Sequence, residues 1–377
     1  MPGKPERSLS AMRIDSRLAR RGGAVEFLRV PGFFFGAAAQ LRGCAYDLGL
    51  LPQTRLEVPV VSVGNLTAGG TGKTPFVALV VRELLERGLR PGIASRGYGS
   101  KQGDPRREND EARLLARSFP AVAGRQNPDR VRAGQELVEA GCDCVVLDDG
   151  FQHRRLARDL DLVLVDATRP WGLPPGGDGR PPVRAFLPRG LMREPASALE
   201  RAHAVCVTRV DQVTEAERLA LGNELHRCAP GVSLLEGCHH PSGLWRGPLG
   251  GDEQGVSQPV PLEELRDRPV DLLSAIGNPE AFTRTLEGLG AKVVQHRMFP
   301  DHHRYEKSDL EGLGEAGRWV LTTEKDAVKL PPDFSFFALA IEFRLESGQP
   351  VLEALLDALP RGPGDARRRN MHAGLAG

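Results

Sequence analysis

The sequence lacks several features that would mark a specialised class of protein. Its 377 residues include only 5% aromatic side chains, six cysteines with no C-x-x-C pair, and a formal net charge of +1. A disulfide framework is not indicated, and a reducing, cytosol-facing location follows. We interpret Cys142 and Cys144, which lie in an apolar run, as core residues rather than metal ligands. The balanced charge gives no global field for nucleic acid, and we expect no nucleic-acid partner.

Long hydrophobic runs are also missing, since no stretch reaches the ~20 apolar residues that span a bilayer. One segment, residues 24–51, is nevertheless rich in phenylalanine and leucine, with Arg29 and Arg42 among them. That composition suits a segment in the membrane interface, with apolar side chains in lipid and arginines at the head groups. A helix packed on the protein's own core would have the same composition, and both interpretations remain open.

What the sequence does contain is a phosphate-binding loop at residues 60–75, VVSVGNLTAGGTGKTP. A β-branched run enters a glycine-rich turn that ends in Gly-Lys-Thr and opens an apolar-periodic helix, which is the context that a P-loop requires. Thr67 stands where the usual pattern has its first glycine. Backbone N–H groups of such a loop hold an oligophosphate, the lysine reaches the outer phosphates, and the threonine hydroxyl can hold Mg²⁺. The residues predicted to bind nucleotide are Thr67, Ala68, Gly69, Gly70, Thr71, Gly72, Lys73 and Thr74.

Strands and helices alternate after this loop, which predicts an α/β fold with a mostly parallel sheet covered on both faces. We expect an N-terminal membrane-associated segment, a P-loop NTPase-like domain, a linker, a smaller C-terminal α/β lobe and a disordered tail. The Asn127-Pro128 pair predicts the N-cap and first residue of a helix that runs to Ala140. The predicted boundaries of the five parts are 1–57, 58–236, 237–268, 269–359 and 360–377.

An apolar strand, residues 145–147, ends in the two acidic residues Asp148 and Asp149. A carboxylate at the carboxyl end of a strand next to a P-loop can reach the Mg²⁺ held by the P-loop threonine. The alternative is an exposed acidic strand end. We predict metal ligation by Thr74, Asp148 and Asp149, without distinguishing which aspartate binds directly.

Phosphoryl transfer also needs a base for the acceptor hydroxyl and cations for the developing charge. Asp110 is a candidate base that could equally cap a helix. The 301–303 run, Asp-His-His, could be a fragment of a metal site or a solvated turn. Arg96 ends a strand at the edge where open α/β sheets bind ligands. The 208–211 run, Thr-Arg-Val-Asp, superficially resembles the guanine-reading [NT]-K-x-D of GTPases, but arginine replaces the lysine.

Several segments together resemble one family, the tetraacyldisaccharide 4′-kinases of lipid A biosynthesis. They occur in the order of that family, and the pair GNLTAGGTGKTP and DDGFQH is the most specific part of the resemblance. The resembling segments are 59–75 (PVVSVGNLTAGGTGKTP), 95–99 (SRGYG), 110–116 (DEARLLA), 147–172 (LDDGFQHRRLARDLDLVLVDATRPWG), 193–195 (REP), 299–305 (FPDHHRY) and 322–330 (TTEKDAVKL).

The resemblance implies transfer of the γ-phosphate of ATP, with Mg²⁺, to the 4′-hydroxyl of a tetraacylated glucosamine disaccharide 1-phosphate, giving lipid IVA. It also implies a monotopic enzyme on the cytoplasmic face of the bacterial inner membrane, whose partners are a lipid substrate and the membrane surface. No obligatory protein partner is inferred. By resemblance, Asp110 and His302 form the catalytic dyad, joined by Lys73 and Arg193, and the substrate-contacting residues are Arg96, Gln152, His153 and Glu194.

The chain departs from the family pattern at three places, of which the smallest is Ala68, where the family often has valine. The family's G-D-E-P around the catalytic aspartate is N-D-E-A here, which leaves Asp104 as a rival to Asp110, and the 172–193 loop is longer. Two other classes of function stay open. One is a P-loop switch or assembly ATPase or GTPase without a small-molecule acceptor, and the other is a kinase for a small soluble sugar or nucleoside.

Overall fold

One continuous sheet organises the molecule. The computed structural model describes residues 17–97, 110–174, 180–247, 260–301 and 303–360, and within them eleven strands lie in the order β3-β2-β4-β1-β5-β6-β7-β11-β10-β8-β9. Every pairing is parallel except that of β7 with β11, so the predicted mostly parallel α/β sheet is confirmed. The strands are β1 Val60–Asn65, β2 Pro91–Ser95, β3 Ala123–Gln126, β4 Cys144–Asp148, β5 Leu160–Asp166, β6 Ala204–Thr208, β7 Ser233–Arg246, β8 Pro269–Ser274, β9 Lys292–Met298, β10 Trp319–Thr323 and β11 Phe337–Ser347.

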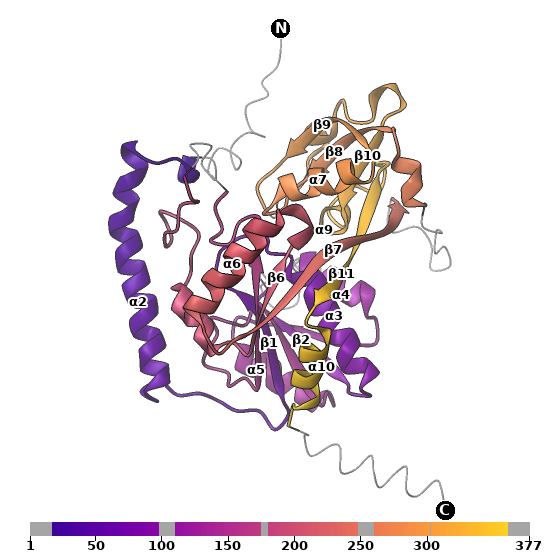
Figure 1. Ribbon diagram of the computed structural model, residues 1–377. Helices are drawn as coiled ribbons and strands as arrows, with labels where there is room; N and C mark the ends of the chain where they lie inside the picture. The colour runs from indigo at the N-terminus through magenta and orange to yellow at the C-terminus, as the bar shows by residue number, and fades with distance from the viewer. Residues whose placement is uncertain (1–16, 98–109, 175–179, 248–259, 302, 361–377) are drawn as a thin grey trace, which may run out of the picture.

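Helices cover the sheet, and one long helix stands apart from it at the side of the molecule (Figure 1). That helix, α2, follows a 3₁₀ turn at Gly23–Leu28. The α-helices are α2 Arg29–Asp47, α3 Lys73–Glu86, α4 Asp110–Ser118, α5 Arg130–Glu139, α6 Glu215–Cys228, α7 Pro279–Gly288, α8 Lys307–Leu310, α9 Glu324–Ala327 and α10 Gln349–Asp357.

The two halves of the sheet are joined by the long antiparallel pair β7 and β11, which runs from the P-loop half to the β8–β10 half (Figure 1). We expected a linker over 237–268, and this is wrong for residues 237–246, which belong to β7. The glycines and Pro241 hide the strand in the sequence. Pro241 pairs with Ile341 next to a register shift, and a bulge is where a strand tolerates proline.

The end of the described chain also returns to the P-loop half. Leu352 and Leu356 of α10 share a core with Phe76 of α3 and with strand β1. Phe343 of β11 packs edge-on against Phe76, with ring centroids 5.1 Å apart. Because β11 carries the chain back across the sheet, α10 covers the first half although the 269–359 boundaries group it with the second.

Local signals account for most helix starts. Thr214 and Glu217 form a capping box at the start of α6, and the Asn278 side chain accepts a hydrogen bond from the N–H of Ala281 in α7. The predicted cap at Asn127 is wrong. Asp129 is the N-cap of α5 and accepts from two backbone N–H groups, while Asn127 Oδ1 accepts from the N–H of Asp129 at 3.0 Å.

Helix α2 exposes its large apolar side chains. Phe33 and Phe34 are 70% and 66% exposed, Leu41 is exposed to a similar degree, and so is Phe27 in the preceding 3₁₀ turn. The opposite side of the helix carries glycines against the 184–192 loop: a Cβ on Gly36 would lie 2.3 Å from the Phe186 ring. The alternative of a helix packed on the core is therefore wrong for these aromatic side chains. Across the described residues, no helix is both long and apolar enough to cross a bilayer.

Candidate functional site

The P-loop lies between β1 and α3, as predicted. Gly72 adopts φ +79°, a left-handed conformation that favours glycine, and Lys73 is the first residue of α3. The Lys73 ammonium lies 3.4 Å from Asn65 Oδ1 and 3.5 Å from Asp149 Oδ1. Asn65 in turn donates to the Thr71 hydroxyl at 3.1 Å. The lysine is thus held over the loop by residues from the ends of β1 and β4.

The predicted acidic pair stands at the carboxyl end of β4, beside this lysine. Asp148 is buried, and burial together with the neighbouring charges of Glu111 and Asp149 raises its pKa to about 7. Its Oδ1 atom is buried with no hydrogen-bond partner within the described residues. An oxygen of this kind is available to a cation.

Asp149 is held differently. Arg193 Nη1 lies 3.0 Å and 2.9 Å from its two carboxylate oxygens. Burial alone would raise the pKa of Asp149, but the charges of Lys73 and Arg193 outweigh that effect and lower it to about 2. Arg193 also donates to Gln152 Oε1 at 3.3 Å, so the DDGFQH and REP segments meet at one point.

Lys325, in the TTEKDAVK segment, reaches the same site from the other half of the sheet. Its ammonium lies 3.1 Å from Glu111 Oε1 and 3.0 Å from Asp301 Oδ1. Burial opposes the charge of Lys325, but the two carboxylates raise its pKa above the ordinary value. Sequence reasoning assigned no role to Glu111 or Lys325. Their only sequence signals were positions in the DEARLLA and TTEKDAVK segments.

The predicted base, Asp110, occupies the first turn of α4. Its Oδ2 lies 3.7 Å from the ammonium of Lys329, which also pairs at 2.7 Å with the fully buried Asp326. Glu111, rather than Asp110, is in the lining of the cavity at the P-loop. His302, the predicted partner of Asp110, lies outside the described residues, as does Asp104, the rival candidate for the base.

Two cavities meet at these residues. The first, of about 380 Å³, is lined by the P-loop from Gly69 to Pro75, by the acidic pair and by the Glu111–Lys325–Asp301 cluster. Five basic side chains face five acidic ones in its lining. The second, of about 710 Å³, lies between α2 and the P-loop half. Three residues line both cavities, so the two spaces adjoin: Arg96, Asp149 and Arg193.

The predicted substrate residues gather in the second cavity. Gln152, His153 and Glu194 line it, together with the exposed Arg96. Gln152 donates to the backbone oxygen of Asn65 at 2.9 Å, and Glu194 is paired with Arg201 at 2.7 Å. These residues lie near the P-loop, in the cavity between the P-loop half and α2.

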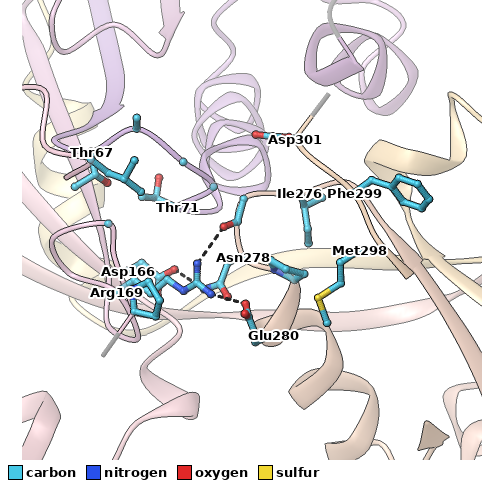
Figure 2. Close-up of a pocket in the computed structure, with 18 residues that line it drawn as sticks. Thr67, Thr71, Asp166, Arg169, Ile276, Asn278, Glu280, Met298, Phe299 and Asp301 are labelled. Carbon is cyan, nitrogen blue, oxygen red and sulfur yellow. Dashed lines mark hydrogen bonds and ion pairs between the residues drawn. The ribbon is translucent and has the colours of Figure 1, made fainter. Parts of the chain in front are cut away.

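A third hollow, of about 340 Å³, lies on the other side of the P-loop (Figure 2). Here residues 166–170 (DATRP) meet the β8–β10 half of the sheet. Arg169 pairs with Glu280 and donates to the Gly277 backbone oxygen at 3.3 Å. Gly277 lies against the P-loop itself, because a Cβ on it would be 2.2 Å from the nitrogen of Gly70. The second half of the sheet therefore contacts the phosphate loop directly.

The TRVD segment, which superficially resembled a guanine-reading motif, supports the loop instead. The Thr208 hydroxyl donates to the Thr71 backbone oxygen at 3.2 Å. Arg209 is paired with the buried carboxylate of Asp166. A guanidinium committed to a buried partner does not lie along a nucleotide base.

Of the Asp-His-His run, the structure describes Asp301 and His303. His303 Nε2 lies 2.8 Å from Asp309 Oδ2, and its ring stacks on Phe299. Among the described residues, no group of three or more histidine, cysteine, aspartate or glutamate side chains is arranged to hold a metal ion. All six cysteines are free, and Cys142 and Cys144 are buried in the core as predicted.

The fold and the loop define a P-loop α/β protein of the nucleotide-dependent class. The family model for LpxK, tetraacyldisaccharide-1-P 4′-kinase, matches residues 24–360. The chain belongs to this family.

Individual relatives agree with the family model. A tetraacyldisaccharide 4′-kinase of Anaeromyxobacter dehalogenans (strain 2CP-1) is 44% identical over 86% of this chain and 87% of its own length. One from Syntrophus aciditrophicus is 38% identical over 89% and 93%. The crystal structure of LpxK from Aquifex aeolicus in complex with ATP is similar with a TM-score of 0.66 and 29% identity, covering 89% of this chain and 98% of that one.

Proposed function

We propose that this protein transfers the γ-phosphate of ATP to the 4′-hydroxyl of a tetraacylated glucosamine disaccharide 1-phosphate, a step of lipid A biosynthesis. One structural observation supports the proposal in addition to membership of the family. The P-loop cavity adjoins a second cavity, which is bounded by a helix with exposed phenylalanines. A nucleotide in the first and an amphiphile's head group in the second would meet at Arg96, Asp149 and Arg193.

Mg²⁺ fits the residues present. The unpartnered Oδ1 of Asp148 and the residue Thr74 belong to the same cavity. Mg²⁺ is held in proteins by one or two carboxylates together with substrate phosphates and water, and a cluster of three acidic side chains is not required. Asp148 and Thr74 would hold the ion, with Asp149 beside them, and the ion would neutralise charge on the transferred phosphate.

Other residues of the chain would bind the phosphates and accept the proton. Lys73 would contact the outer phosphates, and Arg193, aligned by Asp149, would add a cation at the junction of the two cavities. Asp110 would accept the proton of the 4′-hydroxyl, with His302 as its partner. Closure of the β8–β10 half over the P-loop would exclude water, since water would otherwise compete with the sugar hydroxyl.

A lipid acceptor implies where in the cell the protein is located. We propose that α2 lies in the membrane interface on the cytoplasmic face of the bacterial inner membrane, with Phe33 and Phe34 in lipid. In this position the cavity under α2 opens where the head group of a membrane lipid lies.

Acceptor dependence of ATP turnover tests the function against a switch ATPase. ATP hydrolysis and lipid phosphorylation are followed together in detergent micelles with and without tetraacyldisaccharide 1-phosphate. The proposal expects turnover to require the lipid and one phosphorylated lipid per ATP consumed. Steady hydrolysis that ignores the lipid would refute it. Phosphorylation of a soluble amino sugar at a similar rate would favour a small-sugar kinase.

A further inference from the structure

The buried carboxylate of Asp166 lies between the phosphate loop and the start of α7 (Figure 2). It is the last residue of β5, and its side chain is almost completely enclosed. Its Oδ1 atom accepts from the N–H and the hydroxyl of Thr168 at 2.9 Å and 2.7 Å. Its Oδ2 atom accepts from residues of two other elements, Arg209 and Asn278. A buried carboxylate that accepts four hydrogen bonds has a fixed orientation, so it can hold its partners in a fixed relation to one another.

The first of these partners contacts the phosphate loop. Arg209 follows β6 with φ +58°, in the left-handed region that residues other than glycine rarely adopt. From this position its guanidinium donates to the Gly70 backbone oxygen at 3.4 Å as well as to Asp166. Such a backbone conformation persists where the surrounding contacts hold it in place. Asp166 is therefore one side chain away from the loop that would hold the phosphates.

The second partner belongs to the β8–β10 half. Asn278 is buried and is the N-cap of α7, where its Oδ1 accepts from the N–H of Ala281 at 3.2 Å. Its Nδ2 donates to Asp166 Oδ2 at 3.0 Å and to the Thr168 hydroxyl at 3.1 Å. Capping needs only the side-chain oxygen, and serine or aspartate would supply one equally well. The amide NH₂ group, which serine and aspartate lack, is the part of Asn278 that joins the two halves.

Arg169, three residues after Asp166, makes a second connection at the same place. Its guanidinium pairs with Glu280 in the first turn of α7 (Figure 2). The Glu280 side chain is 40% exposed, so this ion pair alone is a weak contact. Residues 166–169 thus contact the start of α7 in two ways, and the contact of Asp166 with Asn278 is the buried one.

The position of the β8–β10 half matters because this half supplies much of the lining of the P-loop cavity. Among its side chains in that lining are those of Ile276, Phe282, Asp301 and Lys325. A shift of α7 would move these side chains relative to the loop, and small misplacements of groups around a reacting phosphate are costly. The shift would also admit water, which competes with the acceptor hydroxyl.

We propose that Asn278 is a positioning residue for phosphoryl transfer, because the hydrogen bond from its amide to Asp166 sets where the β8–β10 half stands over the phosphate loop. Arg209 extends the same connection to Gly70. The contact therefore contributes to ATP binding and to the exclusion of water during transfer. The inference rests on the proposed function for its readout in lipid transfer, whereas its readout in ATP binding does not depend on the acceptor.

The test uses the difference between capping and positioning. Asn278→Ser and Asn278→Asp both keep an N-cap oxygen, but serine removes the donor to Asp166 and aspartate places a second carboxylate against it. We expect the ATP dissociation constant, from calorimetric titration, to rise by about tenfold in Asn278→Ser and by about a hundredfold in Asn278→Asp. In micelles with tetraacyldisaccharide 1-phosphate, the ATP consumed per lipid phosphorylated should rise above the wild-type ratio in both variants. Asn223→Ser, which changes an exposed asparagine of α6, should match wild type in both measurements.

A residue that only caps α7 would give a different order. Capping tolerates serine and aspartate and is lost with alanine. Wild-type ATP affinity in Asn278→Ser and Asn278→Asp, with weaker binding in Asn278→Ala alone, would therefore overturn the inference. Equal losses in all three variants that follow their thermal unfolding temperatures would also overturn it, since such losses reflect stability.

Two further outcomes are decisive. If Asn278→Asp does not fold, the serine variant decides alone: a loss of ATP affinity in folded Asn278→Ser supports the inference, and wild-type affinity overturns it. Weaker ATP binding in the expected order, together with no lipid phosphorylation by wild type, would support the positioning role and contradict the proposed function.

Discussion

The ammonium of Lys325 lies 3.1 Å from the carboxylate of Glu111, although the two residues are 214 positions apart in the chain. Lys325 stands after β10 in the second half of the sheet, and Glu111 is in α4 of the P-loop half. Both line the P-loop cavity. This ion pair thus links the two halves at the place where a triphosphate would lie.

Removal of this charge should weaken nucleotide use. Lys325→Met removes the cation that lies between Glu111 and Asp301, two carboxylates in the lining that would face an anionic ligand, and we expect kcat/KM for ATP to fall by about a hundredfold. Lys325→Arg should retain most of the activity. Lys307→Met, whose lysine is exposed, is the matched control. An unchanged kcat/KM for ATP in Lys325→Met, measured by label transfer at saturating acceptor, would show that the pair has no role in catalysis.

The close approach of Gly277 to the P-loop gives a second prediction. An alanine Cβ there would lie 2.2 Å from the Gly70 nitrogen, so the loop must shift. Because small misplacements of a binding loop are costly, we expect Gly277→Ala to raise the ATP dissociation constant by at least about tenfold. Gly288→Ala, at the end of α7 with open space around it, serves as the control. Calorimetric ATP titration of both variants is the measurement, and equal affinities would refute the contact's importance.

Membrane association should depend on the exposed face of α2. Phe33→Glu with Phe34→Glu places charge on side chains that are 70% and 66% exposed, so the fold should be unaffected. Binding to phospholipid vesicles, followed by co-sedimentation, should weaken by at least about tenfold, given the apolar area lost. Leu219→Glu, an exposed leucine on α6, should bind vesicles like wild type. Full binding by the double variant would rule out α2 as the anchor.

Stability should fall in acid because of His239. Burial and the charge of Arg209 lower its pKa to about 3, and its Nε2 lies 3.5 Å from the Gly72 oxygen at the P-loop. The unfolded chain, with a histidine pKa near 6.5, binds the proton more readily, so stability is full above pH 6.5 and is lost as pH falls toward 3. This group alone contributes up to roughly 1.4 kcal/mol per pH unit in that window.

Substitution of this histidine tests the assignment. The slope of the unfolding free energy between pH 6.5 and 4, from denaturant titrations, should be shallower in His239→Gln than in wild type. The neighbouring and exposed His240→Gln should keep the wild-type slope. Parallel slopes in all three proteins would mean that other groups, such as the half-buried His296, carry the effect.

Sequence patterns predicted the elements whose formation depends mainly on residues that are neighbours in the chain. The buried strands β1, β4 and β5, the P-loop and the acidic pair at the end of β4 could be read from periodicity and turn chemistry. Strand β7 could not, because glycine and Pro241 resemble a linker until a partner strand supplies the pairing. The cap of α5 differed by two residues, since an aspartate competes with an asparagine for the same role.

The pairing partners within the site were also beyond the sequence. Glu111 with Lys325 and Asp110 with Lys329 depend on the packing of α4 against the turn that contains α9, which no spacing rule encodes. Sequence resemblance indicated which segments matter. The structure shows which side chains meet, and the TTEKDAVK segment thereby acquires a physical role as a source of two cations for α4.

The most direct test of the account is transfer of the radiolabelled γ-phosphate of ATP to tetraacyldisaccharide 1-phosphate in mixed micelles, with wild type and Asp110→Ala in parallel. The account predicts labelled lipid from wild type and a drop of at least ~10²-fold in the variant, the usual contribution of a general base. Labelled lipid at the wild-type rate from Asp110→Ala would contradict the assignment of the base. Absence of labelled lipid from wild type, with steady ATP hydrolysis, would contradict the kinase itself.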